Sequence, residues 1–351
     1  MEKIITFAIA AYNSERFLDK CLDSFLCGGE WQEKIEVLIV NDGSTDKTEE
    51  AANRYCKEYS NIFRLINKEN GGHGSVINTA IEHASGKYFK IIDADDWVDK
   101  KVLPKYIEYL ATVESEVILT HYKTYDICTK KYVMWKMYLE EYDCEYTLKY
   151  IMENWKKMDR ALTFHGVTYK TQFYKEKGSK LTEKVFYEDH EYATIPCCYS
   201  EHILALDLCL YIYRIGDVEQ SVSKINQYKK RHNTEQVMLD MAKYYKNNNV
   251  RMTEYGKKYF CEKLGRLFMS YLVIAMLVPK NRRVARKEVT QVVSQINEYM
   301  PEIMQRFNRK YKVFLFMNYM GISYDIYIRM LRSSIYNKLK RNFPLVSEEG
   351  Q

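Results

Sequence analysis

The sequence predicts an α/β protein with a doubly wound, mostly parallel sheet, followed by a helical C-terminal region. Three observations lead to this expectation. Over the first hundred or so residues, short β-branched and aromatic segments alternate with amphipathic helical ones, which is the pattern of βαβ units. Polar residues directly follow several expected strands, at the edge where open α/β sheets bind ligands. Beyond about Ile225 the apolar spacing is helical almost to the end.

The expected elements follow one another with short connections. The first strand, residues 4–11, is almost wholly apolar, as expected of a strand covered on both faces. Further strands are expected at residues 35–40, 62–66 and 87–92, with helices at 15–26, 46–59 and 75–84 between them. At the start of the second helix, Asp46 and Glu49 have the spacing of a capping box.

The second half of the expected domain is less regular. It contains a hairpin that turns at residues 129–131 and a loop at 185–192 that enters a helix. Helices are also expected at 103–111 and 146–155, and strands at 116–120 and 204–215. We place the domain boundary at 225, with an α/β domain at 1–225 and a basic helical region at 226–351.

Three carboxylates follow the fourth strand, at Asp93, Asp95 and Asp96. Adjacent carboxylates repel, so they are tolerated together only in water or around a cation. A hard divalent ion is usually held by one or two carboxylates and completes its shell with waters and substrate phosphates. The pattern therefore indicates a metal–diphosphate site. The alternative is a solvated Asp-rich turn that caps the next helix.

The loops after the first, second and fourth strands are expected to meet at one rim of the sheet. The first loop, Ala11-Tyr12-Asn13, lacks glycine, so the dinucleotide-binding fingerprint is absent where it would have to be. Glycines occur instead in residues 70–75, around His73. Such a loop can present backbone N–H groups to a phosphate or a nucleoside. The alternative is a turn that only lets the chain reverse.

Composition and cysteine usage indicate a globular cytoplasmic protein. The chain is 46% hydrophobic and 28% charged, as in ordinary globular proteins. Its nine cysteines are scattered without a C-x-x-C pair, so we expect reduced thiols. The first residues lead directly into a strand and not into a targeting segment. The longest nearly unbroken apolar run, 267–278, is shorter than the roughly 20 residues that span a bilayer, so we expect a soluble or peripheral protein.

The net charge of +6 is concentrated near the C-terminus. From Lys280 onward there are fourteen Lys or Arg against six Asp or Glu, a net charge of +8. One helical face there carries the apolar residues Tyr324, Ile328, Leu331, Ile335 and Leu339. A basic amphipathic helix indicates a membrane-surface or partner-binding element; the alternative is an ordinary helix packed on the rest of the protein. Nucleic acid is not expected as a partner, because the rest of the chain is net negative and has no recognisable binding module.

Several motifs occur in a fixed order along residues 4 to about 225. They are Tyr12-Asn13, Asn41-Asp42-Gly43-Ser44, the glycine loop with Asn78, Gly86-Lys87-Tyr88, Asp93-x-Asp95-Asp96, Glu188-Asp189, and Tyr213-Arg214 with Ser221-Val222-Ser223. Together and in this order they resemble the family-2 glycosyltransferases. The resemblance implies a GT-A fold and inverting transfer of a sugar from a nucleotide-sugar, most often a UDP-sugar.

The resemblance also implies roles for individual residues. Asp42 would hydrogen-bond the base, with Tyr12 packed near it, and Asp93 would contact the ribose. Asp95 would ligate Mg²⁺ or Mn²⁺, which stabilises the charge that develops on the diphosphate. Asp189 matches the general base, with Glu188 beside it. The full set expected to bind the nucleotide-sugar is Ala11, Tyr12, Asn13, Asp42, Gly72, His73, Asn78, Asp93, Ala94, Asp95 and Arg214.

The sequence departs from the family pattern at two places. Many members have a proline before Tyr-Asn, where this chain has Ala11, and many have an arginine before the helix asparagine, where it has Ile77. If that arginine holds the nucleotide, His73 or a lysine is expected to replace it. Arg214 and Lys224 are expected to close over the diphosphate from a mobile loop; the alternative for Arg214 is a surface ion pair.

The expected function is that of a hexosyl- or N-acetylhexosaminyl-transferase of cell-surface polysaccharide or glycoconjugate synthesis. We expect it in the cytoplasm or peripherally on the inner face of the cell membrane, with a saccharide or lipid-linked saccharide as acceptor. One alternative is an inactive nucleotide-sugar-binding scaffold, which the intact Asp95 and Asp189 disfavour. Another is a nucleotidyltransferase on a similar sheet, which would need a glycine-rich basic loop at residues 10–13 that this sequence lacks.

Overall fold

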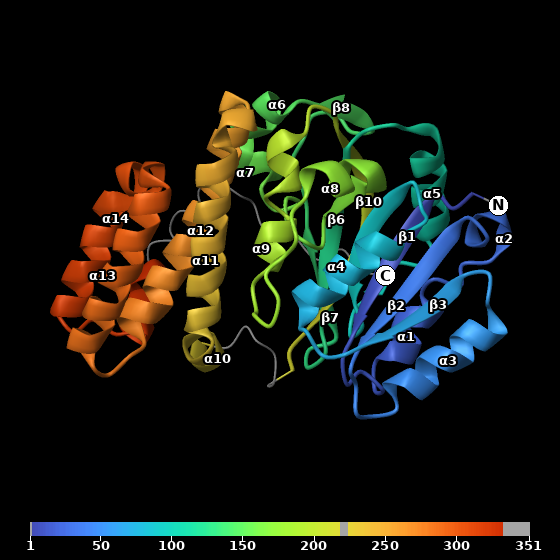
Figure 1. Ribbon diagram of the computed structural model, residues 1–351, viewed down its shortest axis with the longest axis horizontal. Coiled ribbons are helices and arrows are strands. Elements are labelled where there is room, and N and C mark those ends of the chain that lie inside the picture. Colours follow the sequence, from blue (N-terminus) through green and yellow to red (C-terminus); the bar gives the residue numbers. More distant parts are fainter. Residues whose placement is uncertain (1, 218–223, 333–351) are drawn as a thin grey trace.

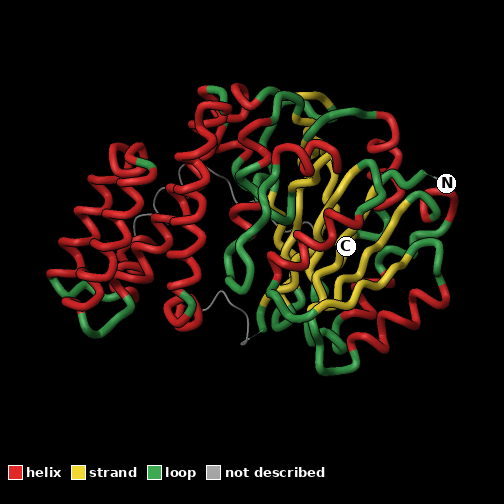
Figure 2. The backbone as a smooth tube through the Cα atoms, viewed as in Figure 1, coloured by secondary structure: helices red, strands yellow, loops and turns green. Residues whose placement is uncertain are grey.

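The computed structural model describes residues 2–217 and 224–332. An α/β unit built on a ten-stranded sheet occupies one side of the molecule, and a group of helices from the C-terminal third stands against its other side (Figure 1). Figure 2 shows the same division, with the strands gathered in one half and only helices and connecting loops in the other. The expected fold class is thus confirmed.

The N-terminal half of the sheet is parallel. Its strand order is β3-β2-β1-β4, and the strands are β1 (Ile5–Ala11), β2 (Ile35–Asp42), β3 (Phe63–Lys68) and β4 (Tyr88–Asp93). The connecting helices are α1 (Leu18–Asp23), α3 (Thr48–Glu58) and α4 (His73–His83), with the short α2 (Gly29–Gln32) before β2. Because crossovers are right-handed, α1 and α3 cover one face and α4 covers the other, in agreement with the packing of α1 on α3 and of α4 on β1 and β2.

The second half of the sheet is mixed. It continues from β4 through β9 (Val167–Lys170), β6 (Val117–Asp126), β10 (Ile203–Ile215) and β5 (Trp97–Val98), while β7 (Lys131–Trp135) pairs with β6 and β8 (Cys144–Tyr146) with β10. Strand β9 runs antiparallel to both of its neighbours. The expected hairpin is confirmed as β6–β7. The helices in this part are α5 (Leu103–Thr112), α6 (Leu148–Glu153), α7 (Trp155–Met158), α8 (Thr171–Lys177), α9 (Asp189–Tyr192) and the 3₁₀ turn η1 (Pro196–Tyr199).

The helical unit packs on the sheet domain mainly through one long helix, α12 (Glu254–Leu277). Its Tyr259 hydroxyl donates to the Ala193 carbonyl at 2.8 Å, and its buried Lys263 donates to the Leu162 carbonyl at 2.5 Å. The other helices of the unit are α10 (Lys224–Lys229), α11 (Arg231–Asn248), η2 (Asn249–Arg251), α13 (Arg282–Tyr299) and α14 (Pro301–Tyr319). One continuous buried core extends through both units, and the boundary at 225 stays a prediction. Among the described residues no helix is both long and apolar enough to cross a membrane.

Local hydrogen bonding changes two expected helix boundaries. The carboxylate of Asp46 accepts from the backbone N–H of Thr48 at 3.0 Å, as an N-cap residue would. The prediction of a capping box is nevertheless wrong. Glu49 accepts from the Asn67 side chain on β3 instead, because that tertiary donor is available to it. The expected helix at 146–155 is interrupted at Asn154, whose side chain donates to the Tyr150 carbonyl, a local bond that competes with continued helix.

The expected apolar stripe near the C-terminus is only partly described. Tyr324 packs against the core, and Ile328 and Leu331 are half-buried. Ile335 and Leu339 lie outside the described residues, as does the Ser221-Val222-Ser223 motif. For Tyr324, the contacts are those of a helix packed on the protein.

The close approach of α12 to the sheet domain depends on Gly256. A Cβ there would overlap the carbonyl oxygen of Cys198. Alanine in a helix is normally more stable than glycine by about 1 kcal/mol, but here we expect Gly256→Ala to lower the free energy of unfolding by about 1–3 kcal/mol, the usual cost of overpacking. Urea unfolding measures this, with the exposed Lys258→Ala in the same helix as control. A more stable Gly256→Ala protein would contradict the packing described for this helix.

Candidate active site

A pocket of about 470 Å³ opens at the rim of the sheet where the ends of β1 and β2 meet the start of α4. Its lining comes from three loops and from the chain before α9. The lining residues are Ala10, Ala11, Tyr12, Asp42, Asn70, Gly72, His73, Val76, Lys184, Val185 and Phe186. The rim predicted from the strand ends therefore exists, and it brings together Ala11, Tyr12, Asp42, Gly72 and His73.

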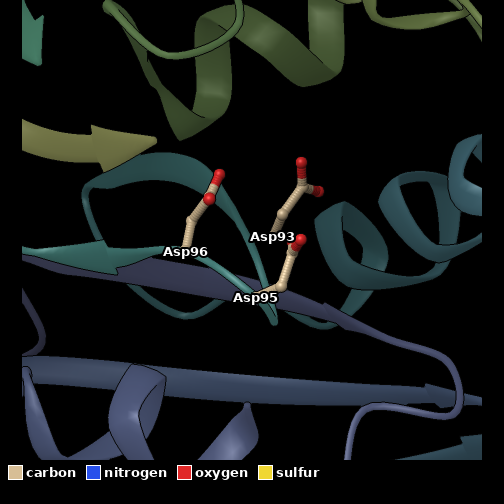
Figure 3. A group of neighbouring side chains, drawn as sticks. All are labelled: Asp93, Asp95 and Asp96. Carbon is tan, nitrogen blue, oxygen red and sulfur yellow. The ribbon is translucent and has the colours of Figure 1, made fainter. Parts of the chain in front are cut away.

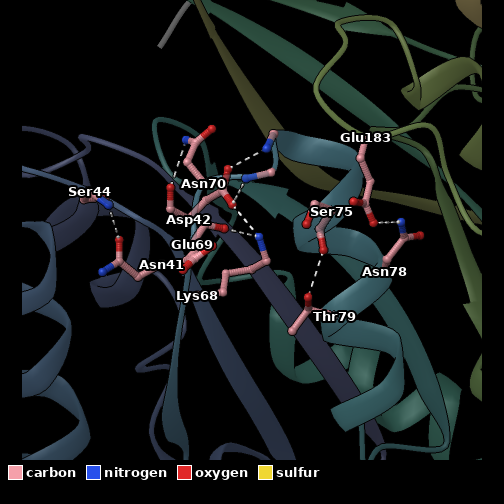
Figure 4. Close-up of polar contacts among 12 residues, drawn as sticks. Asn41, Asp42, Ser44, Lys68, Glu69, Asn70, Ser75, Asn78, Thr79 and Glu183 are labelled. Carbon is pink, nitrogen blue, oxygen red and sulfur yellow. Dashed lines mark hydrogen bonds and ion pairs between the residues drawn. The ribbon is translucent and has the colours of Figure 1, made fainter.

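Asp42 holds the glycine loop against the end of β2. Its buried carboxylate accepts from the backbone N–H groups of Gly71 at 2.9 Å and Gly72 at 2.8 Å, and from the Lys68 ammonium at 2.8 Å (Figure 4). The Asn70 side chain donates to the Asp42 carbonyl at 2.9 Å. A carboxylate has about four lone-pair sites. The three donors from the protein use three of these sites on Asp42, which leaves about one site for a ligand. This bracing of the loop was not foreseen from the sequence.

Asn13 joins the first two loops and does not line the pocket. Its side-chain oxygen accepts from the Thr45 N–H at 2.8 Å, and its own N–H donates to the Ser44 hydroxyl at 3.0 Å. The Asn41 side chain in turn accepts from the Ser44 N–H at 3.2 Å (Figure 4). Asn13 has φ of +47°, a conformation that asparagine tolerates better than most residues. Its observed contacts shape the loops that carry Tyr12 and Asp42.

Asn78 lies apart from the pocket. Its amide donates to the Glu183 carboxylate at 3.1 Å (Figure 4). The same amide donates to the Leu181 carbonyl at 3.0 Å, and the side-chain oxygen accepts from the Leu181 N–H at 2.8 Å. These bonds tie the segment before α9 to helix α4. The predicted contact of Asn78 with the nucleotide-sugar is therefore not supported by its position, because its polar atoms are already used by the protein.

The carboxylates of Asp93, Asp95 and Asp96 gather at the end of β4, with one oxygen of each within 4.8 Å of the others (Figure 3). Asp96 is buried, and it accepts from the Tyr211 hydroxyl at 2.6 Å and the Arg214 N–H at 2.7 Å. Burial and the two neighbouring carboxylates raise the pKa of Asp96 well above its ordinary value. Asp96 therefore joins the acidic loop to β10. The neighbouring Ala94 is also buried, and its N–H donates to the Ala10 carbonyl at 3.2 Å.

Asp95 is the most accessible of the three carboxylates, with 37% of its side chain exposed. Burial of the carboxylate and the charge of Asp93 raise the pKa of Asp95 to about 6. Like charges this close are compensated well by a divalent cation, and oxygen ligands are those that Mg²⁺ and Mn²⁺ prefer. The donor set at Asp93 and Asp95 therefore fits such an ion.

Arg214 lies beside the acidic loop, as expected. Its guanidinium is 3.8 Å from a carboxylate oxygen of Asp95 and 2.9 Å from one of Asp217, and it stacks on the Phe17 ring at 4.4 Å. Lys224, in contrast, forms an ion pair with Asp325 at 2.6 Å. Its expected closure over the diphosphate is not seen, because Lys224 begins α10 and faces the helix that follows α14.

His73 connects the acidic loop to the segment before α9. Its Nε2 lies 2.9 Å from a carboxylate oxygen of Asp93, and its Nδ1 lies 2.6 Å from one of Glu188. Burial alone lowers the pKa of His73, but the charge of Asp93 and the hydrogen bond and charge of Glu188 outweigh it and hold the pKa well above its ordinary value. The ring therefore lies between two carboxylates, with one nitrogen facing each of them.

Glu188 and Asp189 are adjacent in sequence but differ in their surroundings. Glu188 is buried and bonded to His73. Asp189 begins α9 and is half-buried, and its carboxylate has no hydrogen-bond or ion-pair partner within residues 2–217 and 224–332. Its charge acts on His165 and Tyr213, two residues that also feel the charge of Asp93. Asp189 is therefore an available carboxylate close to the acidic cluster.

Several residues of this region were missed in the sequence. Lys184 and Phe186, which form a wall of the pocket, have no signal other than their position shortly before Glu188-Asp189. Tyr211 could have been found, because it is two residues before Tyr213 on the same strand and so faces the same side. His165 also belongs to this region, where its ring packs on Tyr213 with 4.5 Å between the ring centroids.

Comparison with known proteins gives consistent relatives. The family model described as glycosyl transferase family 2 matches residues 6–171. Glycosyltransferase GlyA of Streptococcus pneumoniae serotype 4 is 27% identical over 60% of this chain and 30% of its own length. Putative glycosyltransferase EpsH of Bacillus subtilis is 36% identical over 34% of the chain and 33% of its own length. Poly(ribitol-phosphate) beta-glucosyltransferase of Bacillus spizizenii is 33% identical over 33% of this chain and 18% of its own length. The chain spans about a third or less of these curated relatives.

Among solved structures, S. aureus TarS residues 1–349 in complex with UDP-GlcNAc superposes with a TM-score of 0.65 at 17% identity. The likeness covers 90% of this chain and 89% of that one. The superposition therefore extends beyond the α/β unit into the helical region. It shows that the chain has the GT-A fold followed by helices.

Asp95 and Asp96 are expected to respond differently to the same substitution. Asp96→Ala removes the partner of two buried donors, so we expect a loss of about 1–3 kcal/mol of folding free energy for each. Asp95→Ala should keep or slightly raise the melting temperature of the free protein, because a repelling charge is removed. It should also abolish the rise in melting temperature that Mn²⁺ gives to the wild type. An unchanged Mn²⁺ effect in Asp95→Ala would remove this residue from the candidate metal site.

Proposed function

Because residues 6–171 of this chain belong to glycosyltransferase family 2, we propose that it is an inverting glycosyltransferase of cell-surface polysaccharide or glycoconjugate synthesis. It would move a hexosyl or N-acetylhexosaminyl group from a nucleotide-sugar to a hydroxyl of a saccharide or lipid-linked saccharide. A UDP-sugar is the first candidate for the donor. The observation that carries this proposal is the meeting, at one rim of the sheet, of a nucleoside-sized pocket, an acidic cluster and an available carboxylate.

The pocket of about 470 Å³ is the proposed nucleoside site. Tyr12 lies at its mouth with 53% of its surface exposed, so the ring offers a face on which a base can stack. Asp42 lines the pocket with about one free lone-pair site, which suits a base N–H donor. Asp93, across His73 from this pocket, would face the ribose. The TarS complex with UDP-GlcNAc supports a uridine nucleotide as the first candidate.

Asp95, together with Asp93, is proposed to hold the divalent ion. When bound, Mg²⁺ or Mn²⁺ stabilises the negative charge that develops on the leaving nucleoside diphosphate. Arg214 adds a second positive charge beside Asp95 and would act on the same diphosphate. Because Asp96 is buried and fully engaged with β10, it is assigned a structural role.

Asp189 is proposed as the general base. It would accept the proton of the acceptor hydroxyl as that oxygen bonds to the anomeric carbon and the bond to the diphosphate breaks. Displacement from the face opposite the leaving group inverts the anomeric centre. Asp189 is assigned this role, and not Glu188, because its carboxylate has no partner among the described residues whereas Glu188 is bonded to His73.

The two alternative functions have less support. An inactive scaffold would not need an unpartnered Asp189 beside an intact acidic cluster. A nucleotidyltransferase would need a basic loop after β1 for a triphosphate, but that loop carries Tyr12 and Asn13, and its polar groups bond to the next loop.

A membrane surface is the proposed second partner, at the inner face of the cell membrane. Four apolar side chains form an exposed stripe on α14 and its C-cap, here called the α14 patch, and they are Val313, Phe316, Tyr319 and Met320. Exposed basic residues lie along the same face and on the residues that follow, namely Arg309, Lys312, Arg329 and Arg332. Apolar side chains beside cationic ones suit the boundary of an anionic bilayer.

Replacement of the proposed base tests the reaction. Asp189→Asn removes the proton acceptor but keeps the shape of the side chain. We expect kcat with the natural acceptor to fall by roughly 10²-fold or more, while the rise in melting temperature with UDP and Mn²⁺ stays as in the wild type. A panel of nucleotide-sugars with and without Mn²⁺ identifies the donor beforehand. Wild-type turnover in Asp189→Asn would exclude this residue as the base.

Vesicle binding tests the membrane contact. Basic residues near an anionic surface contribute about 1 kcal/mol each, and the Debye length shrinks from about 10 Å at 0.1 M salt to about 3 Å at 1 M. We therefore expect the protein to sediment with anionic vesicles at low salt and to be released at high salt. Phe316→Ser with Met320→Ser should weaken this binding, whereas Val250→Ser, at an exposed apolar residue of η2, should not. Equal binding by all variants, or none by the wild type, would exclude the α14 patch as a lipid contact.

A further inference from the structure

The segment that leads into Asp189 is attached to the N-terminal end of α4. The backbone N–H of Lys184 donates to the Gly71 carbonyl at 2.7 Å, and Asn78 holds Leu181 through two hydrogen bonds. A Cβ at Gly74 would overlap the carbonyl oxygen of Thr182, so only glycine permits this approach. The chain before Asp189 therefore rests on the same helix end that forms a wall of the nucleoside pocket.

The last attachment before Asp189 is the bond between Glu188 and His73. The carboxylate of Glu188 is 4% exposed and lies 2.6 Å from Nδ1 of His73. On the other side of the ring, Nε2 faces Asp93 at 2.9 Å. The Phe164 ring packs on the imidazole edge, with 5.5 Å between centroids. One side chain thus joins the end of β4 to the residue directly before Asp189.

Fixing Glu188 also fixes the start of α9. The Glu188 carbonyl accepts from the N–H groups of Glu191 at 2.9 Å and Tyr192 at 3.2 Å, which are bonds of the first turn. The preceding Tyr187 has φ of +79°, a strained conformation for a bulky residue that persists only when its surroundings hold it. The contacts of Glu188 supply that restraint immediately after the strained residue.

We propose that His73 is a positioning residue, which joins Glu188 to Asp93 and so sets the place of Asp189 relative to the donor end of β4. This inference rests on the proposed function, since it assigns a purpose to the base. It also assigns Glu188 as a hydrogen-bond acceptor for His73 and not as a second proton acceptor. The imidazole of His73 then sets the positions of both the nucleotide-sugar, which is held at Asp93, and the base Asp189, which is held through Glu188.

Two substitutions of Glu188 separate positioning from proton transfer. Glu188→Gln keeps an oxygen that accepts from Nδ1 of His73, whereas Glu188→Leu removes the acceptor. Because a misplacement of about 1 Å can lower a rate by about 10²-fold, we expect Glu188→Leu to lower kcat by about ten- to a hundredfold. The KM for the donor should change by less than about threefold, and Glu188→Gln should stay within about threefold of the wild type.

A double-mutant cycle tests whether His73 and Glu188 act as one link. His73→Phe keeps a ring against Phe164 but loses both polar contacts. We expect the double variant His73→Phe with Glu188→Leu to have a kcat no more than about threefold below the poorer single variant. Glu183→Gln serves as the matched control, because Glu183 is a glutamate of the same segment that bonds to Asn78 and does not touch His73. It should behave as the wild type.

Hydrogen exchange gives a readout that needs no substrate. If His73 restrains the segment, the amides of residues 187–192 should exchange about tenfold faster in His73→Phe than in the wild type. In Glu183→Gln their exchange rates should equal those of the wild type. This measurement also applies if Glu188→Leu does not fold. A wild type without turnover or nucleotide binding would refute the proposed function, and the exchange rates would still report on the link.

Three results would overturn the inference itself. Glu188→Gln as inactive as Glu188→Leu would mean that the Glu188 carboxylate transfers the proton. The bond to His73 would not position the base if both Glu188 variants were as active as the wild type. The same would follow if the losses of kcat in the two single variants multiplied in the double variant. Unchanged amide exchange in His73→Phe would mean that the ring does not restrain the segment.

Discussion

The crowding of three carboxylates at the end of β4 is the constraint around which this rim of the sheet is arranged. Each carboxylate is compensated by a different part of the chain. Asp96 is buried against β10, Asp93 faces Nε2 of His73, and Asp95 lies near Arg214. Repulsion between like charges is thereby used to bring β10, helix α4 and the segment before α9 to one place. Asp93 and Asp95 keep side chains that are 34% and 37% exposed, whereas Asp96 is buried.

The glycine loop is held by the same kind of interaction on the other side of the pocket. The Asp42 carboxylate accepts from two backbone N–H groups of the loop, with the Lys68 ammonium beside them. Gly43 has φ of +71° and lies so close to Asn70 that a side chain would be crowded there. Charge-assisted bonds of this kind are stronger than neutral ones. The pocket is therefore largely formed before any ligand arrives.

The helical unit supports the site mainly through α12, and α11 adds a bond in which the Thr182 hydroxyl donates to Asp240 at 3.3 Å. Tyr259 and Lys263 bond to carbonyl groups on the chain just after α9 and just before β9. Burial lowers the pKa of Lys263 to about 8, which indicates how fully this contact is removed from water. The helices thus support the back of the segment that carries Asp189, while its front rests on α4. This arrangement explains why one core runs through both units.

The sequence alone determined the order of strands and helices, because periodicity of apolar residues is a local property that each segment carries with it. It also determined that Asp42, Asp93 and Asp95 would lie at one edge of the sheet, since the carboxyl ends of parallel strands share that edge. It could not decide which of two adjacent carboxylates is available. Glu188 and Asp189 differ because His73, 115 residues earlier in the chain, takes one of them. Likewise, Glu49 and Asn78 were assigned by local or family pattern, but tertiary partners at Asn67 and Leu181 use their polar atoms. Long-range hydrogen bonds have no sequence period, and so only the folded structure decides them.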